Sequence, residues 1–156
     1  MRSAALSGLL LLGAVAAGAD PAGRVWEVNG VRLEAAQVDR LAGDIARQTV
    51  AAVRRVDGLT LHGEQEVALE AVYRDAALDV YDRAVAIVNR SDLSDAAKEE
   101  EVKTLVLNGQ LRSTAYAQRI LDPDQYRIYR AWEDQQVEAF KKRGLWSSSS
   151  RGRRSR

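Results

Sequence analysis

Cysteine is absent from this 156-residue chain, and histidine, methionine and phenylalanine occur once each. The lack of cysteine excludes a disulfide, a thiolate nucleophile and a cysteine-ligated zinc site. The single histidine, His62, excludes a multi-histidine metal site, and its sequence neighbours supply neither the nucleophile nor the orienting acid that a general base needs. A solvated or capping histidine is the alternative. We therefore predict no catalytic residue, no metal and no cofactor.

Long hydrophobic runs are also scarce, and the one that stands out lies at the N-terminus. Arg2 precedes the uncharged, Leu- and Ala-rich run Ala4–Ala17, and Ala17-Gly18-Ala19 supplies the small residues that a signal peptidase reads. This pattern predicts a secretory signal peptide at residues 1–19 and a periplasmic or secreted protein. The alternative is an uncleaved membrane anchor, although a helix needs ~20 apolar residues to span a bilayer. After cleavage we expect no transmembrane span.

The chain also lacks an excess of either charge, since 23 basic and 22 acidic side chains leave a net charge of +1. The body before the C-terminal tail, residues 20–146, is acidic in balance, so it lacks the basic stripe of a nucleic-acid-binding domain. We expect no nucleic-acid partner. The tail, residues 147–156, is rich in serine and predicted to be disordered, and it could contact an anionic envelope surface. It contains four arginines, namely Arg151, Arg153, Arg154 and Arg156.

Hydrophobic residues make up 46% of the whole sequence, which is enough to form a folded core. The length of the chain favours one helical domain, at residues 20–146. Alternation around Asn29-Gly30 predicts a short β-hairpin at residues 24–33. Residues 34–144 show helical periodicity with breaks. The fold class is therefore all-α: a four-helix antiparallel or hairpin-like arrangement with a short N-terminal β-hairpin. The expected helices run from Glu34 to about Val56, from Leu61 or Glu64 to Asn89, from Ser94 to Ile120, and from Asp122 to Gly144.

Local signals define some helix starts better than others. Asp122, Pro123 and Gln125 form a capping box with proline at the first helical position, and Leu121 precedes the cap. Thr60 is the candidate cap of the second helix. Inside the third helix, glycine in Asn108-Gly109 costs about 1 kcal/mol relative to alanine. This dipeptide predicts either a kink or a close helix crossing.

The tyrosines and tryptophans have two interpretations. Tyr73 and Tyr81 lie eight positions apart and can share a helix face, and the last helix adds Tyr129 and Trp132. They can pack in the core, or they can form an aromatic surface that binds partners or unfolded chains. Arg47 and Arg54 on the first helix could rim such a surface, or they could belong to an ordinary solvated face.

The segment Leu121-Asp122-Pro123-Asp124-Gln125 resembles the Leu-Thr-Pro-x-Gln motif of the CpxP/Spy family of small periplasmic helical proteins. In that family an earlier copy of the motif opens an earlier helix. Leu59-Thr60 is the matching position here, with Gly63 where glutamine is expected and Gln65 two residues late. Asp122 replaces the threonine of the motif, and aspartate caps a helix equally well. The resemblance extends over residues 59–140.

This resemblance implies a curved, antiparallel, all-α homodimer in the periplasm that acts without ATP as a chaperone or envelope-stress adaptor. Its partners would be another protein or an unfolded client. Some relatives bind zinc through histidines that this chain lacks, and many are rich in methionine and strongly basic, which this chain is not. The first hypothesis is therefore an exported, non-enzymatic helical binding protein.

Two other functional classes stay open. The chain could be a structural or interaction protein of the envelope whose arginine tail contacts anionic lipid or polysaccharide. An enzyme would need a pocket with convergent polar groups. A second resemblance, of Val25–Ile45 to the opening of SurA-type periplasmic foldases, would make the protein a chaperone-only remnant, since no prolyl-isomerase domain follows. A binding protein predicts an open aromatic stripe, and a structural one predicts a stripe buried within one chain.

Overall fold

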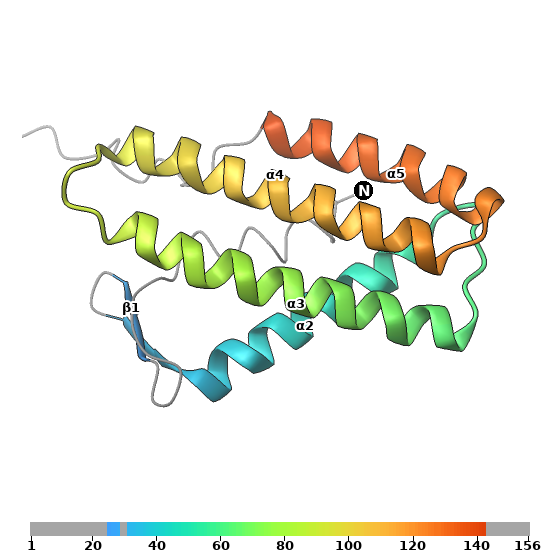
Figure 1. Ribbon diagram of the computed structural model, residues 1–156, viewed down its shortest axis with the longest axis horizontal. Coiled ribbons are helices and arrows are strands. Elements are labelled where there is room, and N and C mark those ends of the chain that lie inside the picture. The colour runs from blue at the N-terminus through green and yellow to red at the C-terminus, as the bar shows by residue number, and fades with distance from the viewer. Residues whose placement is uncertain (1–24, 29–30, 143–156) are drawn as a thin grey trace, which may run out of the picture.

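The computed structural model describes residues 25–28 and 31–142 (Figure 1). Within them the chain is a bundle of four α-helices, as the sequence predicted. The predicted signal peptide, the Asn29-Gly30 turn and the arginine tail lie outside the described residues. The elements are β1 (Val25–Val28), β2 (Val31–Glu34), α2 (Ala35–Val53), α3 (Gly63–Val88), α4 (Asp95–Ile120) and α5 (Pro123–Lys141).

The two strands pair antiparallel, with Val25 opposite Glu34 and Val28 opposite Val31. The turn that would join them as the expected hairpin falls on residues 29–30, so its type stays a prediction. Glu34 then leads directly into α2, and its N–H donates to Oε1 of Gln37 at 2.7 Å. This bond satisfies one of the backbone donors that the start of a helix leaves free.

Two of the predicted helix starts have the expected caps. The Ser94 hydroxyl accepts from the N–H of Ala97 at 3.2 Å and begins α4. The Asp122 carboxylate accepts from the N–H of Gln125 at 2.8 Å, and Pro123 is the first residue of α5. Thr60, in contrast, is not a cap, because α3 begins at Gly63 with His62 in the cap position. The N–H of His62 donates to Oε1 of Gln65 at 2.9 Å, so the cap lies two residues after Thr60, and the helix begins between the two predicted starts, Leu61 and Glu64.

The first helix ends earlier than its periodicity predicted. α2 stops at Val53, and the N–H of Val56 donates to the carbonyl of Val53 at 3.0 Å in a tight turn. Gly58 follows with a φ of +79°, a left-handed conformation that glycine adopts without strain. Val56 is therefore part of the turn, although it remains half-buried against the core.

The helices form an antiparallel sequence in which α3 contacts α2 on one side and α4 on the other, and α5 lies along α4 at the edge (Figure 1). Two apolar clusters fill the interior. Each helix gives one of its halves to the first cluster and the other half to the second, so the clusters occupy opposite ends of the bundle. The first cluster includes Val38, Ile45, Val80, Val106 and Phe140, and the second includes Val53, Leu69, Tyr73, Ala117 and Tyr129.

At Gly109, α4 packs tightly against α3. A Cβ at this position would lie 2.7 Å from Cγ2 of Val80, which is shorter than any ordinary contact. α4 continues as a single helix through this point. The structure therefore agrees with one of the two predicted roles of Asn108-Gly109, a close helix crossing.

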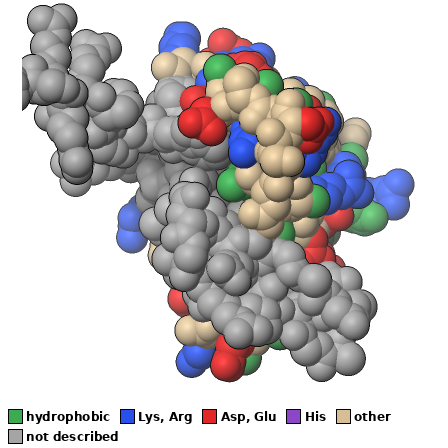
Figure 2. Space-filling model, turned by 90° about the vertical axis from the view of Figure 1, so that its left-hand side faces the viewer, with side chains coloured by type: hydrophobic (Ala, Val, Ile, Leu, Met, Phe, Trp, Pro, Cys, Tyr) green, Lys and Arg blue, Asp and Glu red, His purple; other side chains and the backbone are tan. Residues whose placement is uncertain are grey.

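The surface carries charges of both signs. At the end of the molecule seen in Figure 2, acidic and basic side chains lie among one another over the described residues. Arg90, in the connection between α3 and α4, bonds Asp92 at 2.7 Å and Glu101 at 3.3 Å. Across the described part of the chain, every helix is too short or too polar to cross a membrane.

Candidate functional site

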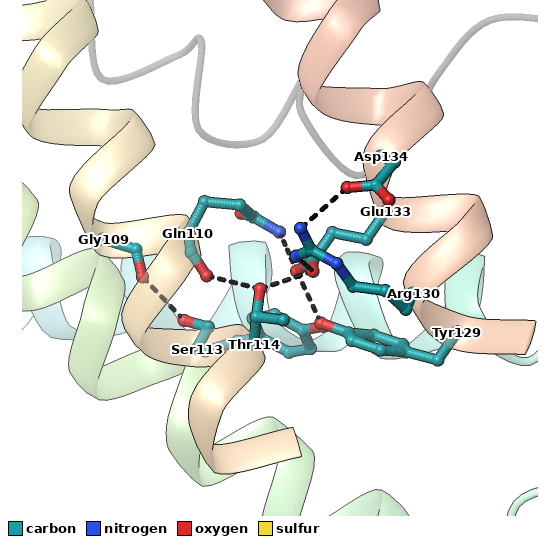
Figure 3. A network of polar contacts seen from close by, with 9 residues as sticks. Gly109, Gln110, Ser113, Thr114, Tyr129, Arg130, Glu133 and Asp134 are labelled. Carbon is teal, nitrogen blue, oxygen red and sulfur yellow. Dashed lines mark hydrogen bonds and ion pairs between the residues drawn. The ribbon is translucent and has the colours of Figure 1, made fainter. Parts of the chain in front are cut away.

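The most unusual side chain of the bundle is Glu133 on α5, which is 0% exposed. A carboxylate loses its hydration when it is buried and needs donors to replace it. Four side chains supply them (Figure 3). Oε1 accepts from Nε2 of Gln110 at 2.7 Å and from the Tyr129 hydroxyl at 2.8 Å. Oε2 accepts from the Arg130 guanidinium at 3.1 Å and from the Thr114 hydroxyl, which shares its one proton between Oε2 and the carbonyl of Gln110, 2.9 Å away.

These donors come from two helices. Gln110 and Thr114 lie one turn apart on α4, so their side chains point from the same face toward α5. Tyr129 and Arg130 precede Glu133 by four and three residues on α5 itself. Arg130 also bonds Asp134 at 2.9 Å, so the guanidinium bridges a buried and an exposed carboxylate. The charge of Glu133 is thus balanced from its own helix.

Tyr73 extends this network to α3. Its hydroxyl oxygen lies 2.6 Å from that of Tyr129. Because Tyr129 donates its only proton to Glu133, Tyr73 must donate to Tyr129. Burial raises the pKa of both phenols above the usual 10.0, and the nearby charge of Glu133 acts in the same direction. Both tyrosines therefore keep their protons, and the hydrogen-bond chain joins α3 to α5.

The arrangement anchors helices rather than presenting a reactive group. Each carboxylate oxygen of Glu133 accepts two hydrogen bonds, and the side chain has no exposed surface that a substrate could reach. Among the described residues, no group of three or more potential metal-ligating side chains is close enough to hold an ion. We refer to Tyr73, Gln110, Thr114, Tyr129, Arg130 and Glu133 as the Glu133 network.

A second polar contact joins the starts of α3 and α5. Nε2 of Gln65 donates to Oε1 of Gln125 at 2.7 Å, and Nε2 of Gln125 lies 3.0 Å from Oε1 of Gln65. Each amide group also donates to the turn before the other helix: Gln65 to the carbonyl of Ile120 at 3.2 Å, and Gln125 to that of Thr60 at 2.6 Å. We call this reciprocal pair the glutamine clasp.

The glutamine clasp repeats one local pattern twice. Each glutamine is the third residue of its helix and accepts through Oε1 from the N–H of its own cap, His62 for Gln65 and Asp122 for Gln125, both at 2.9 Å. A leucine precedes each cap, Leu61 in the first copy and Leu121 in the second. The two helix starts therefore share the glutamine contact and face each other, and Asp122 alone also accepts through its side chain, from the N–H of Gln125.

A groove of about 470 Å³ separates α4 from the second half of α5. Its inner end reaches Gln110, Thr114 and Arg130, so it adjoins the Glu133 network. Leu111 on its rim is 58% exposed, one of three large apolar side chains in the described residues that protrude into solvent. Charged residues of α5 line the opposite wall. The remaining lining residues are Thr104, Leu107, Asn108, Asp134, Val137, Glu138 and Lys141.

The structure separates the two interpretations of the aromatic residues. Tyr73, Tyr81 and Tyr129 are at most 4% exposed, so they pack in the core, as the first of the two interpretations has it, and do not form an open surface. A partner-binding role for these residues stays a prediction. Trp132 is half-buried, with its ring 5.9 Å from that of Tyr129. The reason is geometric, since α3 and α5 direct these faces toward each other across the bundle.

Arg47 and Arg54 lie on a solvated face of α2 rather than beside the tyrosines. Arg47 pairs with Asp44 at 2.6 Å, and Arg54 pairs with Glu66 of α3 at 3.2 Å. Both arginine side chains are about three-fifths exposed, at 59% and 61%. Exposed pairs of this kind contribute little to stability. The four tail arginines lie outside the described residues.

Sequence reasoning missed the Glu133 network and half of the glutamine clasp. Helical periodicity allows either Trp132 or Glu133 on the apolar face of the last helix, and the structure buries Glu133, four residues after Tyr129. The first half of the clasp has no signal at the predicted cap Thr60, because the cap of α3 is His62. Comparisons with protein-family models, with curated proteins and with solved structures found no match, so the interpretation of both polar contacts depends on their own geometry.

Proposed function

We propose that this protein is an exported, non-enzymatic helical binding protein that acts without ATP as a periplasmic chaperone or envelope-stress adaptor. The observation that carries the proposal is the glutamine clasp. The CpxP/Spy family has two copies of a Leu-Thr-x-x-Gln motif at helix starts, and the clasp pairs two Leu-x-x-x-Gln segments at the starts of α3 and α5.

The clasp changes the register of the first copy. The sequence comparison placed it at Leu59-Thr60, where Gln65 came two residues late. With His62 as the cap, the copy is Leu61-His62-Gly63-Glu64-Gln65, which has the same spacing as Leu121–Gln125. Histidine then stands where the motif has threonine. The equal spacing of both copies supports the resemblance and the activity, location and homodimer that it implies.

The buried tyrosines do not form the open aromatic stripe that we expected of a binding protein, so we place the client in the α4–α5 groove instead. Leu107, Leu111 and Val137 offer apolar contact, and charged groups of both signs lie beside them. An unfolded chain exposes apolar side chains among polar backbone groups, so a mixed lining of this kind suits it. We expect client segments rich in apolar residues to bind here.

The test is suppression of aggregation of a chemically unfolded client protein by the purified chain from Asp20 to Arg156, without ATP. We expect suppression at near-stoichiometric amounts that persists after residues 147–156 are deleted. Leu111→Glu, which places a charge on the groove rim, should weaken suppression. Val67→Glu is the matched control, because Val67 is 72% exposed on α3 and does not line the groove.

Absence of suppression by the unmodified chain would overturn the proposal. The alternative, an envelope interaction protein, predicts a different result: salt-sensitive binding to vesicles of anionic lipid or to acidic polysaccharide that is lost when residues 147–156 are deleted. Sedimentation of the same preparation tests the proposed homodimer, which requires about twice the mass of one chain.

A further inference from the structure

The interface that holds α5 differs in chemistry from the other helix interfaces. The buried side chains of α5 are Gln125, Tyr129, Glu133 and Phe140, of which only Phe140 is purely apolar. The partly buried Tyr126, Ile128 and Trp132 add apolar contact with the second cluster at the first half of the helix. In contrast, the buried side chains of α3 include Leu69, Ala77, Val80, Ala84 and Val85. Apolar contacts lose their whole contribution when an interface opens, whereas hydrogen bonds are replaced by bonds to water. The α5 interface is therefore the one that water can replace most readily.

Glu133 strengthens this argument. When α5 separates from α4, the carboxylate loses two donors, Gln110 and Thr114, and regains its hydration. It keeps Tyr129 and Arg130, because both belong to α5. The buried carboxylate thus holds α5 closed only while α4 supplies donors at the right positions.

The groove lies at the same interface. It separates the second half of α5 from α4 over several turns, from Arg130 to Lys141 on one wall and from Thr104 to Thr114 on the other. In this stretch Phe140 is the single fully buried apolar side chain of α5. The first half is held by the glutamine clasp and by Tyr129. The groove is therefore a poorly packed part of the interface, along which α4 and α5 can separate.

We propose that α5 separates from α3 and α4 as a unit by rotation about the connection at Leu121 and Asp122, and that the Glu133 network holds it in the closed state. Separation of α5, which we call the latch helix, uncovers a client-binding surface on α3 and α4. This inference rests on the proposed function for the nature of the ligand, an unfolded chain. The surface beneath α5 includes Leu69, Tyr73 and Ala117, which pack against Tyr129 in the closed state. Tyr73, a residue predicted to bind partners, becomes accessible only in the open state.

Hydrogen exchange of the intact mature chain tests the opening without any client. We expect the amides of α5 to exchange about tenfold or more faster than those in the centres of α3 and α4. Thr114→Val, which keeps the volume of the side chain and removes a donor to Glu133, should accelerate exchange in α5 alone, again about tenfold. Ser113→Ala is the matched control, since the neighbouring hydroxyl is equally buried but bonds the carbonyl of Gly109 in its own helix at 3.1 Å.

Equal exchange in α5 and in the centres of α3 and α4 would overturn the latch, and so would an acceleration by Thr114→Val that is the same in all helices. Such results mean that the bundle opens only as a whole. A result of this kind leaves the chaperone proposal intact, because the exchange measurement contains no client.

A cross-link tests whether opening serves binding. The chain has no cysteine, so Thr104→Cys with Lys141→Cys places one thiol on each wall of the groove, at the end farthest from Leu121 and away from the apolar side chains assigned to the client, and a bismaleimide can join them. We expect the joined protein to lose aggregation suppression relative to the same double variant with both thiols blocked by a monofunctional maleimide. Retained suppression after joining would overturn the link between opening and binding. Failure of the blocked variant and of the unmodified chain alike would instead overturn the proposed function.

Discussion

At the residue scale, Glu133 illustrates how a carboxylate can be buried in a bundle of this size. Removing it from water costs several kcal/mol, and its four hydrogen bonds offset that cost only because each donor is placed correctly. Arg130 balances the charge, and Tyr129 and Tyr73 extend the network to α3. The residue that helix periodicity left ambiguous is thus the centre of the polar interior.

Removal of this carboxylate should be one of the most damaging single changes. Glu133→Ala leaves the buried Gln110 amide and Tyr129 hydroxyl without their acceptor and creates a cavity. We expect it to lower the free energy of unfolding by about 3 kcal/mol, measured by urea denaturation. Asp134→Ala, at the exposed next position, should change it by less than about 0.5 kcal/mol. Similar losses for the two variants would contradict a structural role for the network.

The buried phenols make stability sensitive to alkali. Burial raises the pKa of Tyr73 and of Tyr129 in the folded chain, so the unfolded chain ionises first, near its usual value of 10.0. The stabilisation from the protonated phenols is complete below pH 10 and is lost as the pH rises through the folded pKa values. The urea midpoint should therefore fall above pH 10. Tyr73→Phe should make this fall shallower, whereas Tyr116→Phe, at a 53% exposed position, should leave it unchanged.

At the scale of the elements, local sequence signals and contacts between distant segments act together. Asp122 and Ser94 begin their helices through bonds to residues three positions later, and these starts were predictable from sequence. At α3 the bond runs the other way, because the side chain of Gln65 accepts from the N–H of His62 three positions earlier. The second role of Gln65, the contact with Gln125 across the bundle, involves a residue 60 positions away. A local pattern cannot reveal that partner.

The glutamine clasp should contribute measurable coupling between α3 and α5. Gln65→Ala and Gln125→Ala should each lower the free energy of unfolding by about 1 to 2 kcal/mol, because each leaves part-buried polar groups of the other helix without a partner. The double variant should lose less than the sum, with a coupling of about 1 kcal/mol. Additive losses in urea denaturation would mean that the two glutamines act only as caps of their own helices.

A substitution at Gly109 tests how tightly α3 and α4 pack at this position. Gly109→Ala gains helix propensity but places a Cβ against Val80, so we expect a net loss of about 1 to 2 kcal/mol in the free energy of unfolding. In a Val80→Ala background the contact is absent, and the same change should become neutral or stabilise by up to about 1 kcal/mol. An equal effect of Gly109→Ala in both backgrounds would exclude the contact as the cause.

At the scale of the whole molecule, three helices share an apolar interior and the fourth is attached at the edge. α2, α3 and α4 contribute most of the first cluster, to which α5 adds only Phe140. Tyr129 carries α5 into the second cluster. The bundle therefore has interfaces of unequal character, which is the basis of the proposed latch.

Because α5 is held by a more polar interface than the other helices, we expect α5 to unfold first. With Trp26 and Trp146 replaced by phenylalanine, fluorescence reports only on Trp132, which lies on α5 beside Tyr129. We expect its transition to occur at lower urea concentration than the main loss of helical circular dichroism, because α5 opens before the other helices. Coincident transitions would indicate a single cooperative unit.

The sequence by itself determined the number of helices and two of the helix starts. These features depend on residue type and on bonds between residues within about one turn of each other, so a linear pattern contains them. It left the choice between a buried and an open aromatic stripe unresolved, and it misplaced the cap of α3.

Only the tertiary structure decided which polar side chains meet. Tyr73 and Tyr129 are 56 positions apart, Gln65 and Gln125 are 60 apart, and Gln110 and Glu133 are 23 apart. Their pairing depends on how α3, α4 and α5 are turned toward one another, which packing of the apolar faces determines. Burial then gives these polar contacts their importance, because a polar group in the interior must find a partner that no local sequence pattern specifies.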